Sequence, residues 1–347
     1  MKYYSCMLLE RCYLNFNGRI DVDNRKHMTF CCEVLGDVPG AALAGSPEES
    51  IKNFFKVRKS FIEESKKISL FGTQLAGESA NLTDKCKKCA HFKMMDWGKS
   101  EALINYINLS TYPAPCQCKC MYCGIAQNSE LRIYQAQKHQ LYYEKVFDVL
   151  EYAKNKNLIS PEALWQISSG EITIHPFKER IFNLVRYKHV HFYTNCFIFD
   201  EEIAQILKSN PYAAINLSID SGTSQTWKKI KGVDNFAVVT ENLVKYFTSS
   251  SRPGQITLKY IILPGINDTA DDFTFVVEIM KILKTGHLTL SRDTGIKYFL
   301  GDEESEKLVK SAGRLVSLLQ KNGLSFDMFT YLPEERENII AYAKETV

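Results

Sequence analysis

The chain has 347 residues, of which 45% are hydrophobic and 24% charged, and its formal net charge at pH 7 is +3. This length allows one large α/β domain or two smaller ones, and this composition excludes wholesale disorder and collagen-like repeats. The small net charge gives no argument for a nucleic-acid partner. Clustered lysines such as Lys85, Lys87 and Lys88 are therefore interpreted as a solvated face.

No window of the sequence approaches the roughly 20 apolar residues that a membrane span needs, and the N-terminal segment lacks an apolar stretch of signal-peptide length. We therefore expect a cytoplasmic protein without a membrane partner. The chain holds 11 cysteines, and only Cys196 lies beyond residue 123. Because a reducing compartment disfavours structural disulfides, this cysteine usage favours metal or redox chemistry.

The first hundred residues have little regular hydrophobic periodicity. They contain the turn-rich stretch "LGDVPGAALAGSPEES", one expected helix over residues 50–67, and widely spaced cysteines. A segment with so little core of its own often needs a bound metal to fold. We therefore predict a small cysteine-rich domain over residues 1–100.

From residue 101 onward, short β-branched or aromatic runs alternate with segments of helical period. Such alternation predicts an α/β fold with parallel strands joined by right-handed crossovers, and a functional site at the C-terminal ends of the strands. A tail over residues 301–347 is expected to extend this core. The expected strands are 102–110, 164–168, 189–194, 213–220, 255–262, 287–290, 296–300 and 324–329, and the expected helices are 140–155, 177–187, 200–209, 235–247, 269–284, 303–322 and 333–345.

Four cysteines crowd into "CQCKCMYC", residues 116–123, directly after the first of these strands. Cys116, Cys120 and Cys123 have CxxxCxxC spacing, so their thiolates can hold three irons of a 4Fe-4S cluster and leave the fourth iron open to a ligand. Cys118 is then surplus, either pointing away from the cluster or packed beneath the loop. A zinc site with Cys118 as its fourth ligand is the alternative.

This loop resembles that of the radical SAM superfamily, whose pattern has an aromatic residue before the last cysteine, as Tyr122 is here. The resemblance covers roughly residues 101–295, because four further strand ends match in order: "SSGEITIHP", "YTNC", "NLSIDSGTSQTWKKIKG" and "LKYIILPGIND". Ser169 replaces the usual first glycine of the Gly-Gly-Glu segment. Cys196 stands where glycine is common, and Lys231 is the basic residue before glycine.

The resemblance implies a partial (β/α)6 barrel over residues 101–300 and an enzyme that binds a 4Fe-4S cluster and S-adenosylmethionine. Reductive cleavage would give a 5'-deoxyadenosyl radical that abstracts hydrogen from a small-molecule, peptide or sugar-like substrate. Dehydrogenation, epimerisation and crosslinking are the implied outcomes, with flavodoxin or ferredoxin as reductant. The alternative is a metal-stabilised binding or electron-transfer protein that cleaves no S-adenosylmethionine.

The resemblance also implies roles for single residues. Cofactor contacts are implied for Tyr122 near the adenine, for Ser169, Gly170 and Glu171 at the amino group, for Asn195, Ser218 and Asp220 at the ribose or methionine end, and for Lys231 at the carboxylate. Ordinary structural readings stay open for several of them: Glu171 as a solvated loop acid, Asp220 as a helix N-cap and Lys231 as part of a helix ending. Cys196 is either a hydrogen-atom donor to a substrate radical or a small core residue.

A second metal site is expected among the N-terminal cysteines. Cys86 and Cys89 have CxxC spacing and can supply two ligands to a cluster or to zinc. The arrangement resembles the start of SPASM-type auxiliary-cluster domains, although those usually follow the radical SAM core. The preferred ligands of this second 4Fe-4S cluster are Cys6, one of Cys31 and Cys32, Cys86 and Cys89, with Cys12 as a substitute for Cys6. Zinc, or buried cysteines without a ligand, are the alternatives.

Overall fold

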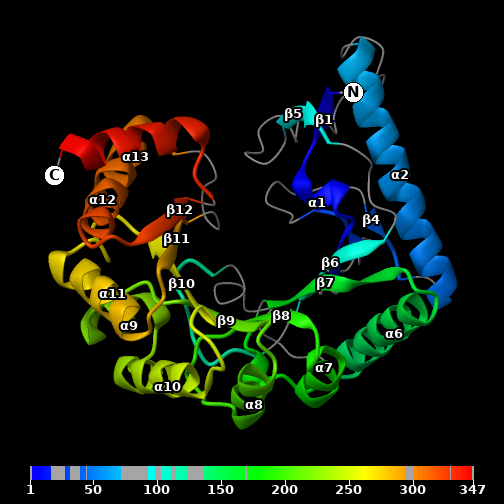
Figure 1. Cartoon of the computed structure of the whole chain (residues 1–347), viewed down its shortest axis with the longest axis horizontal. Helices are drawn as coiled ribbons and strands as arrows, with labels where there is room; N and C mark the ends of the chain where they lie inside the picture. The colour runs from blue at the N-terminus through cyan, green and yellow to red at the C-terminus, as the bar shows by residue number, and fades with distance from the viewer. Residues whose placement is uncertain are drawn as a thin grey trace. The chain divides into compact units, whose positions relative to one another are not determined.

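The computed structural model describes residues 2–16, 28–31, 40–43, 45–71, 93–97, 103–110, 115–123, 136–168, 170–293, 300–328 and 330–345. Among the helices in these ranges, none combines the length and apolar character that a transmembrane span requires. The chain forms two units, one of Met1–Pro113 with Tyr134–Ser169 and one of Ala114–Ile133 with Gly170–Val347. Each unit is described by itself (Figure 1).

The first unit is built on a short parallel sheet. Its strands β2 (Tyr13–Phe16), β6 (Ile104–Ser110) and β7 (Ile159–Ser168) are parallel neighbours, and β3 (Met28–Thr29) and β4 (Gly40–Ala41) add to β2 in antiparallel pairs. A separate antiparallel pair consists of β1 (Lys2–Ser5) and β5 (Lys93–Asp96). The helices are α1 (Met7–Glu10), α2 (Pro47–Phe71) and α6 (Ala136–Asn155).

Helix α2 forms because its apolar residues recur on one face. Ile51, Phe54, Phe61 and Ile62 are all buried, as the helical period requires. The Arg58 guanidinium, on the same helix, donates to the Leu9 carbonyl with a 2.7 Å Nη2–O distance. The same carbonyl also accepts from the Cys12 amide at 3.3 Å, so Arg58 adds a second donor at the end of α1.

The second unit contains five parallel strands in sequential order. They are β8 (His189–Tyr193), β9 (Ala213–Ser218), β10 (Ile256–Ile262), β11 (His287–Arg292) and β12 (Ser325–Met328). The helices are α7 (Lys178–Val185), α8 (Glu201–Ser209), α9 (Ser224–Lys231), α10 (Phe236–Ser249), α11 (Ala270–Ile282), α12 (Asp302–Lys321) and α13 (Pro333–Glu345), preceded by the 3-10 helix η3 (Ile172–Ile174).

Burial alternates along these strands because each has one apolar and one polar face. Leu217, Leu258 and Leu288 are almost fully buried, whereas their neighbours on the other face keep some exposure. Figure 1 shows α7, α8 and α10 along one side of β8 and β9. Three connecting helices begin with a side-chain cap, from Asp200, Thr223 and Thr269.

The predicted α/β class with parallel strands is confirmed, and each predicted helix in the described ranges is present. The N-terminal segment was expected to form a separate small domain. Instead, its strand β2 pairs in parallel with β6, with Tyr13 opposite Tyr106. Backbone hydrogen bonds need no particular side-chain pattern, so this pairing could not be predicted from periodicity. The units divide near residues 113 and 169 instead of at residue 100. The domain ranges drawn from the sequence stay a prediction, and most of the expected strand 296–300 lies outside the described residues.

Candidate functional site

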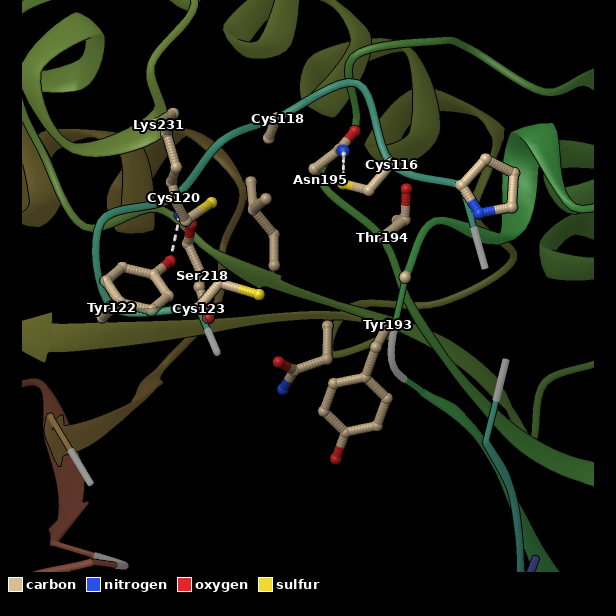
Figure 2. A pocket seen from close by; sticks show the side chains of 14 residues that line it. Cys116, Cys118, Cys120, Tyr122, Cys123, Tyr193, Thr194, Asn195, Ser218 and Lys231 are labelled. Carbon is tan, nitrogen blue, oxygen red and sulfur yellow. Dashed lines mark hydrogen bonds between the residues drawn. The ribbon is translucent and has the colours of Figure 1, made fainter. Parts of the chain in front are cut away.

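A cavity of about 340 Å³ lies in the second unit where the cysteine loop meets the ends of β8 and β9. Its wall includes all four loop cysteines, Tyr122, Gly170, Ser218 and Lys231 (Figure 2). The position agrees with the expectation that a parallel sheet carries its site at the C-terminal ends of its strands. The residues that the sequence marked at separate strand ends are thereby brought to one place.

The loop is held by the end of α9. Two loop amides donate to the last carbonyls of this helix, Lys119 N to Lys231 O at 2.7 Å and Met121 N to Ile230 O at 2.9 Å. Gly232 ends the helix in the left-handed conformation, with φ of 70°, and a Cβ there would lie 2.9 Å from the Lys119 Cβ. Glycine is required here both for its backbone angle and for the close approach of the loop.

The loop thiols differ in acidity because Cys118 lies between two of them. Hydrogen bonds with the Cys118 side chain lower the pKa of Cys116 and lower that of Cys120 to about 6, where the Lys231 charge also contributes. The same hydrogen bonds, together with burial, raise the pKa of Cys118. Cys118 is 3% exposed and lines the same cavity as the other three cysteines, so its role as the surplus thiol stays a prediction. Thiolates at the flanking positions are the form that binds iron.

The thiol arrangement fits a cluster better than a single ion. In the ranges that the structure describes, no three His, Cys, Asp or Glu side chains converge on one ion position. A 4Fe-4S cluster does not need such convergence, because each thiolate binds a different iron. Cys116, Cys120 and Cys123 all line the same cavity, as a cluster with one open iron requires.

Asn195 places an amide beside the first of these sulfurs. Its Nδ2 lies 3.7 Å from Cys116 Sγ (Figure 2) and 3.2 Å from the Gln117 side-chain oxygen. Amide hydrogen bonds to ligating sulfur are among the contacts by which proteins tune cluster potentials. The side chain therefore faces Cys116, a predicted iron ligand, and its contact with the ribose or methionine end stays a prediction.

The Glu171 carboxylate is buried beneath the site instead of solvated. It accepts from the Thr173 amide and hydroxyl at 3.1 and 2.9 Å, from the Thr194 hydroxyl at 2.8 Å and from the Asn195 amide at 2.7 Å. Burial raises its pKa, and these four donors oppose that rise. Glu171 is absent from the cavity wall, so it acts on the site by holding Thr194 and Asn195, which both line it. Its contact with a bound amino group stays a prediction.

Tyr122, Asp220 and Lys231 form a closed triangle of hydrogen bonds. Lys231 Nζ lies 2.6 Å from both the Tyr122 hydroxyl and Asp220 Oδ2, and the Tyr122 hydroxyl donates to that same carboxylate oxygen at 2.6 Å. Figure 2 shows the tyrosine and the lysine meeting over the loop. Asp220 is 0% exposed and Lys231 is 3% exposed, so the pair is almost entirely shielded from solvent. Burial alone would lower the Lys231 pKa, but the Asp220 and Cys120 charges raise it.

These contacts change the interpretation of Asp220. The cap of α9 is Thr223, so the reading of Asp220 as the N-cap is wrong. Its other oxygen accepts from the Ile261 amide at 2.6 Å, and its backbone has a positive φ of 45°. Asp220 is absent from the cavity wall, whereas Ser218 and Lys231 are part of it. Direct contacts of these three residues with a cofactor stay predictions.

Two supporting residues were not singled out from the sequence. Asn267 is fully buried, donates to the Asp220 and Ile261 carbonyls at 2.9 and 2.8 Å, and accepts from the Leu263 amide at 2.8 Å. Thr194 bridges the end of β8 to Glu171. Both stand in quoted strand-end motifs, "PGIND" and "YTNC". Thr194 directly follows the buried strand β8, and a polar residue in that position is a signal that could have marked it.

Cys196 is fully buried and is not part of the cavity wall. Its backbone is left-handed, with φ of 55°, which explains why glycine is common at this place in the family pattern. The Asn242 amide donates to its carbonyl at 3.0 Å, and burial raises the pKa of its thiol. This placement favours the core-residue reading, and the hydrogen-donor role stays an untested prediction.

The remaining predicted residues are only partly described. Gly170 lines the cavity with a positive φ of 66°, and Tyr122 lines it with its ring. Ser169, Cys32, Cys86 and Cys89 lie outside the described residues. Cys6 and Cys31 are partly buried and Cys12 is buried. The auxiliary ligand set therefore stays a prediction.

Comparison with known proteins finds a family match in the central part of the chain. The family model described as the radical SAM superfamily matches residues 115–276, a little under half of the chain. No curated protein matches the chain.

Solved structures that resemble the chain do so at low identity. SuiB of Streptococcus suis bound to the precursor peptide SuiA matches at 13% identity and a TM-score of 0.46, covering 84% of this chain and 56% of SuiB. A radical SAM methyltransferase from Sphaerobacter thermophilus matches at 12% and 0.41, covering 64% and 65%. HydG, a maturase of the [FeFe]-hydrogenase, matches at 13% and 0.44, covering 90% and 71%. The chain thus spans a little over half the length of SuiB.

Proposed function

We propose that this chain, whose residues 115–276 match the family model of the radical SAM superfamily, cleaves S-adenosylmethionine reductively and abstracts hydrogen from an organic substrate. The observation that carries the proposal is the cavity lined by three correctly spaced thiols at the ends of parallel strands. The superfamily uses a 4Fe-4S cluster and S-adenosylmethionine, and it needs an external reductant.

Cys116, Cys120 and Cys123 would each bind one iron. A bound cluster with an open iron would supply the electron for reductive cleavage of S-adenosylmethionine, which is the source of the radical that abstracts hydrogen in this chemistry. The lowered thiol pKa values of Cys116 and Cys120 support their role as ligands, because thiolates bind metal.

The other residues of the site position this machinery. The Tyr122, Asp220 and Lys231 triangle ties the loop to the end of β9, and α9 holds the loop backbone. Asn195 donates toward the Cys116 sulfur, and such an outer contact orients a ligand and adjusts its electronics. Gly170 and Ser218 offer backbone and hydroxyl groups in the cavity wall for the polar end of S-adenosylmethionine.

The substrate and outcome follow only from the family resemblance. Dehydrogenation, epimerisation or crosslinking of a peptide or sugar-like molecule, with flavodoxin or ferredoxin as reductant, is the proposed reaction class. A second cluster on the N-terminal cysteines would favour such multi-electron outcomes, because it could accept an electron from a substrate radical.

Anaerobic reconstitution with iron and sulfide, followed by dithionite and S-adenosylmethionine, tests the proposal. We expect 5'-deoxyadenosine from the wild type and at least about a hundredfold less from Cys120→Ala, since the open-iron cluster cannot form without a third thiolate. Cys118→Ala is the matched control from the same loop and should retain cluster iron. A wild type that holds the cluster and forms no 5'-deoxyadenosine would instead be a binding or electron-transfer protein.

A further inference from the structure

Strands β9 to β12 present a continuous polar row beside the cluster cavity. Register partners in parallel strands share one face of the sheet, so the row can be read directly from the pairing. It consists of Ser218, Lys259, Thr289 and Asp327. Their sequence neighbours, such as Leu258, are buried on the opposite face. The sheet is therefore polar on one side over four strands.

This row is continuous with the cavity. Ser218 is both the first member of the row and part of the cavity wall. Lys259 lies opposite it on the next strand, about 4.8 Å away in the hydrogen-bonding direction. Asn216, two residues before Ser218, also lines the cavity and pairs with Thr257. A molecule that reaches beyond the cluster along this face meets Lys259 first.

Most polar groups of the face already have partners within the sheet. The Asn216 amide donates to the Thr257 hydroxyl at 2.9 Å. Asp327 Oδ2 accepts from the Thr289 hydroxyl at 3.1 Å and lies 2.8 Å from the His287 imidazole. Among the described residues of this face, Lys259 is the cation that these bonds do not include.

The Lys259 side chain is partly buried, and no acceptor or carboxylate among the described residues lies within bonding distance of its ammonium group. Burial lowers its pKa and nearby Lys231 adds to that fall, while the more distant carboxylates of Asp220 and Asp327 oppose it. An ammonium group that has no partner among the described residues can pair with an anionic ligand.

We propose that Lys259 binds a carboxylate of the substrate, holding the substrate on the polar face next to the cluster cavity. This assignment rests on the proposed function, because it supplies the substrate class for that site. One lysine with a neighbouring serine hydroxyl matches a single negative charge, whereas a phosphate dianion would leave charge uncompensated. The carboxylate can belong to an acidic or C-terminal residue of a peptide, or to a small organic acid.

Selective acetylation of the reconstituted wild type with N-hydroxysuccinimidyl acetate tests this, with each lysine quantified by peptide mass spectrometry. Glutarate, a glutamate-containing peptide with blocked termini, inorganic phosphate and chloride are compared at equal ionic strength. We expect glutarate or the peptide to slow acetylation of Lys259 several-fold, and phosphate or chloride to do so far less. Protection by the peptide and not by glutarate would identify a peptide source, and the reverse would identify a small acid.

Two lysines of α9 serve as internal controls. Lys229 is exposed and should be acetylated at the same rate in every solution, whereas buried Lys231 should stay unmodified. The proposal is overturned if Lys259 resists acetylation without ligand, if no carboxylate protects it, or if phosphate protects it equally. Formation of 5'-deoxyadenosine is measured on the same preparation. Its absence would refute the proposed function while the protection result still decides the carboxylate site.

Discussion

At the scale of single residues, the site depends on a charged pair that is withdrawn from water. Lys231 and Asp220 are both buried, and Tyr122 completes their hydrogen bonding. Taking either charge away leaves the other uncompensated in a medium of low dielectric. The hydrogen bonds of this triangle also join residues far apart in sequence, because Tyr122 and Lys231 are separated by 109 positions.

We therefore expect Lys231→Met to lower the free energy of unfolding by about 3–5 kcal/mol, since Asp220 would keep a buried charge without a partner. The double variant Lys231→Met with Asp220→Asn should recover part of that loss. Urea unfolding followed by circular dichroism measures both. The Lys228–Asp234 pair at 3.1 Å, with side chains 63% and 58% exposed, provides the control. Lys228→Met should cost less than about 1 kcal/mol, and equal losses at the two pairs would contradict the argument.

At the scale of secondary-structure elements, the end of α9 carries the cysteine loop. Its last carbonyls accept from Lys119 and Met121, and the chain then turns at Gly232. The end of this helix therefore positions the loop that carries the predicted iron ligands. The loop cannot come this close if a side chain stands at residue 232.

Gly232→Ala should reduce the iron bound after reconstitution to less than about half of the wild-type amount. Alanine is strained at a positive φ, and its Cβ would clash with Lys119. Gly265→Ala is the matched control: its φ is also positive, at 76°, but nothing lies within 4 Å of an added Cβ. That variant should lose about 1 kcal/mol of stability and keep its iron. Iron and sulfide assays with urea unfolding distinguish the two, and equal iron loss would show that backbone strain alone matters.

At the scale of the whole molecule, the open question is the number of clusters. The cysteines of the first unit and those of the loop belong to different units. If the N-terminal cysteines bind a second 4Fe-4S cluster, the reconstituted chain should hold about eight irons, and otherwise about four.

The variant with Cys86→Ala and Cys89→Ala should then fall from about eight irons to about four while still forming 5'-deoxyadenosine. Iron and zinc are counted together by plasma mass spectrometry. An unchanged iron count in this variant would exclude both cysteines as cluster ligands. Zinc in place of the second four irons would favour a structural site.

The sequence by itself determined the features that depend on local spacing. Periodicity predicted the alternating strands and helices of the second unit, because burial repeats along a strand or a helix within a few residues. The spacing of Cys116, Cys120 and Cys123 predicted the loop, since ligands on one short segment need no distant partner.

Only the tertiary structure decided which groups meet across the chain. It paired Lys231 with Asp220 and Tyr122, buried Glu171 among four donors, and placed Lys259 beside Ser218 with no acceptor among the described residues. It also paired β2 with β6 through backbone hydrogen bonds, which no side-chain pattern predicts. Such contacts depend on how separate segments pack, and packing selects partners by shape and desolvation over the whole unit, which no local window of sequence contains.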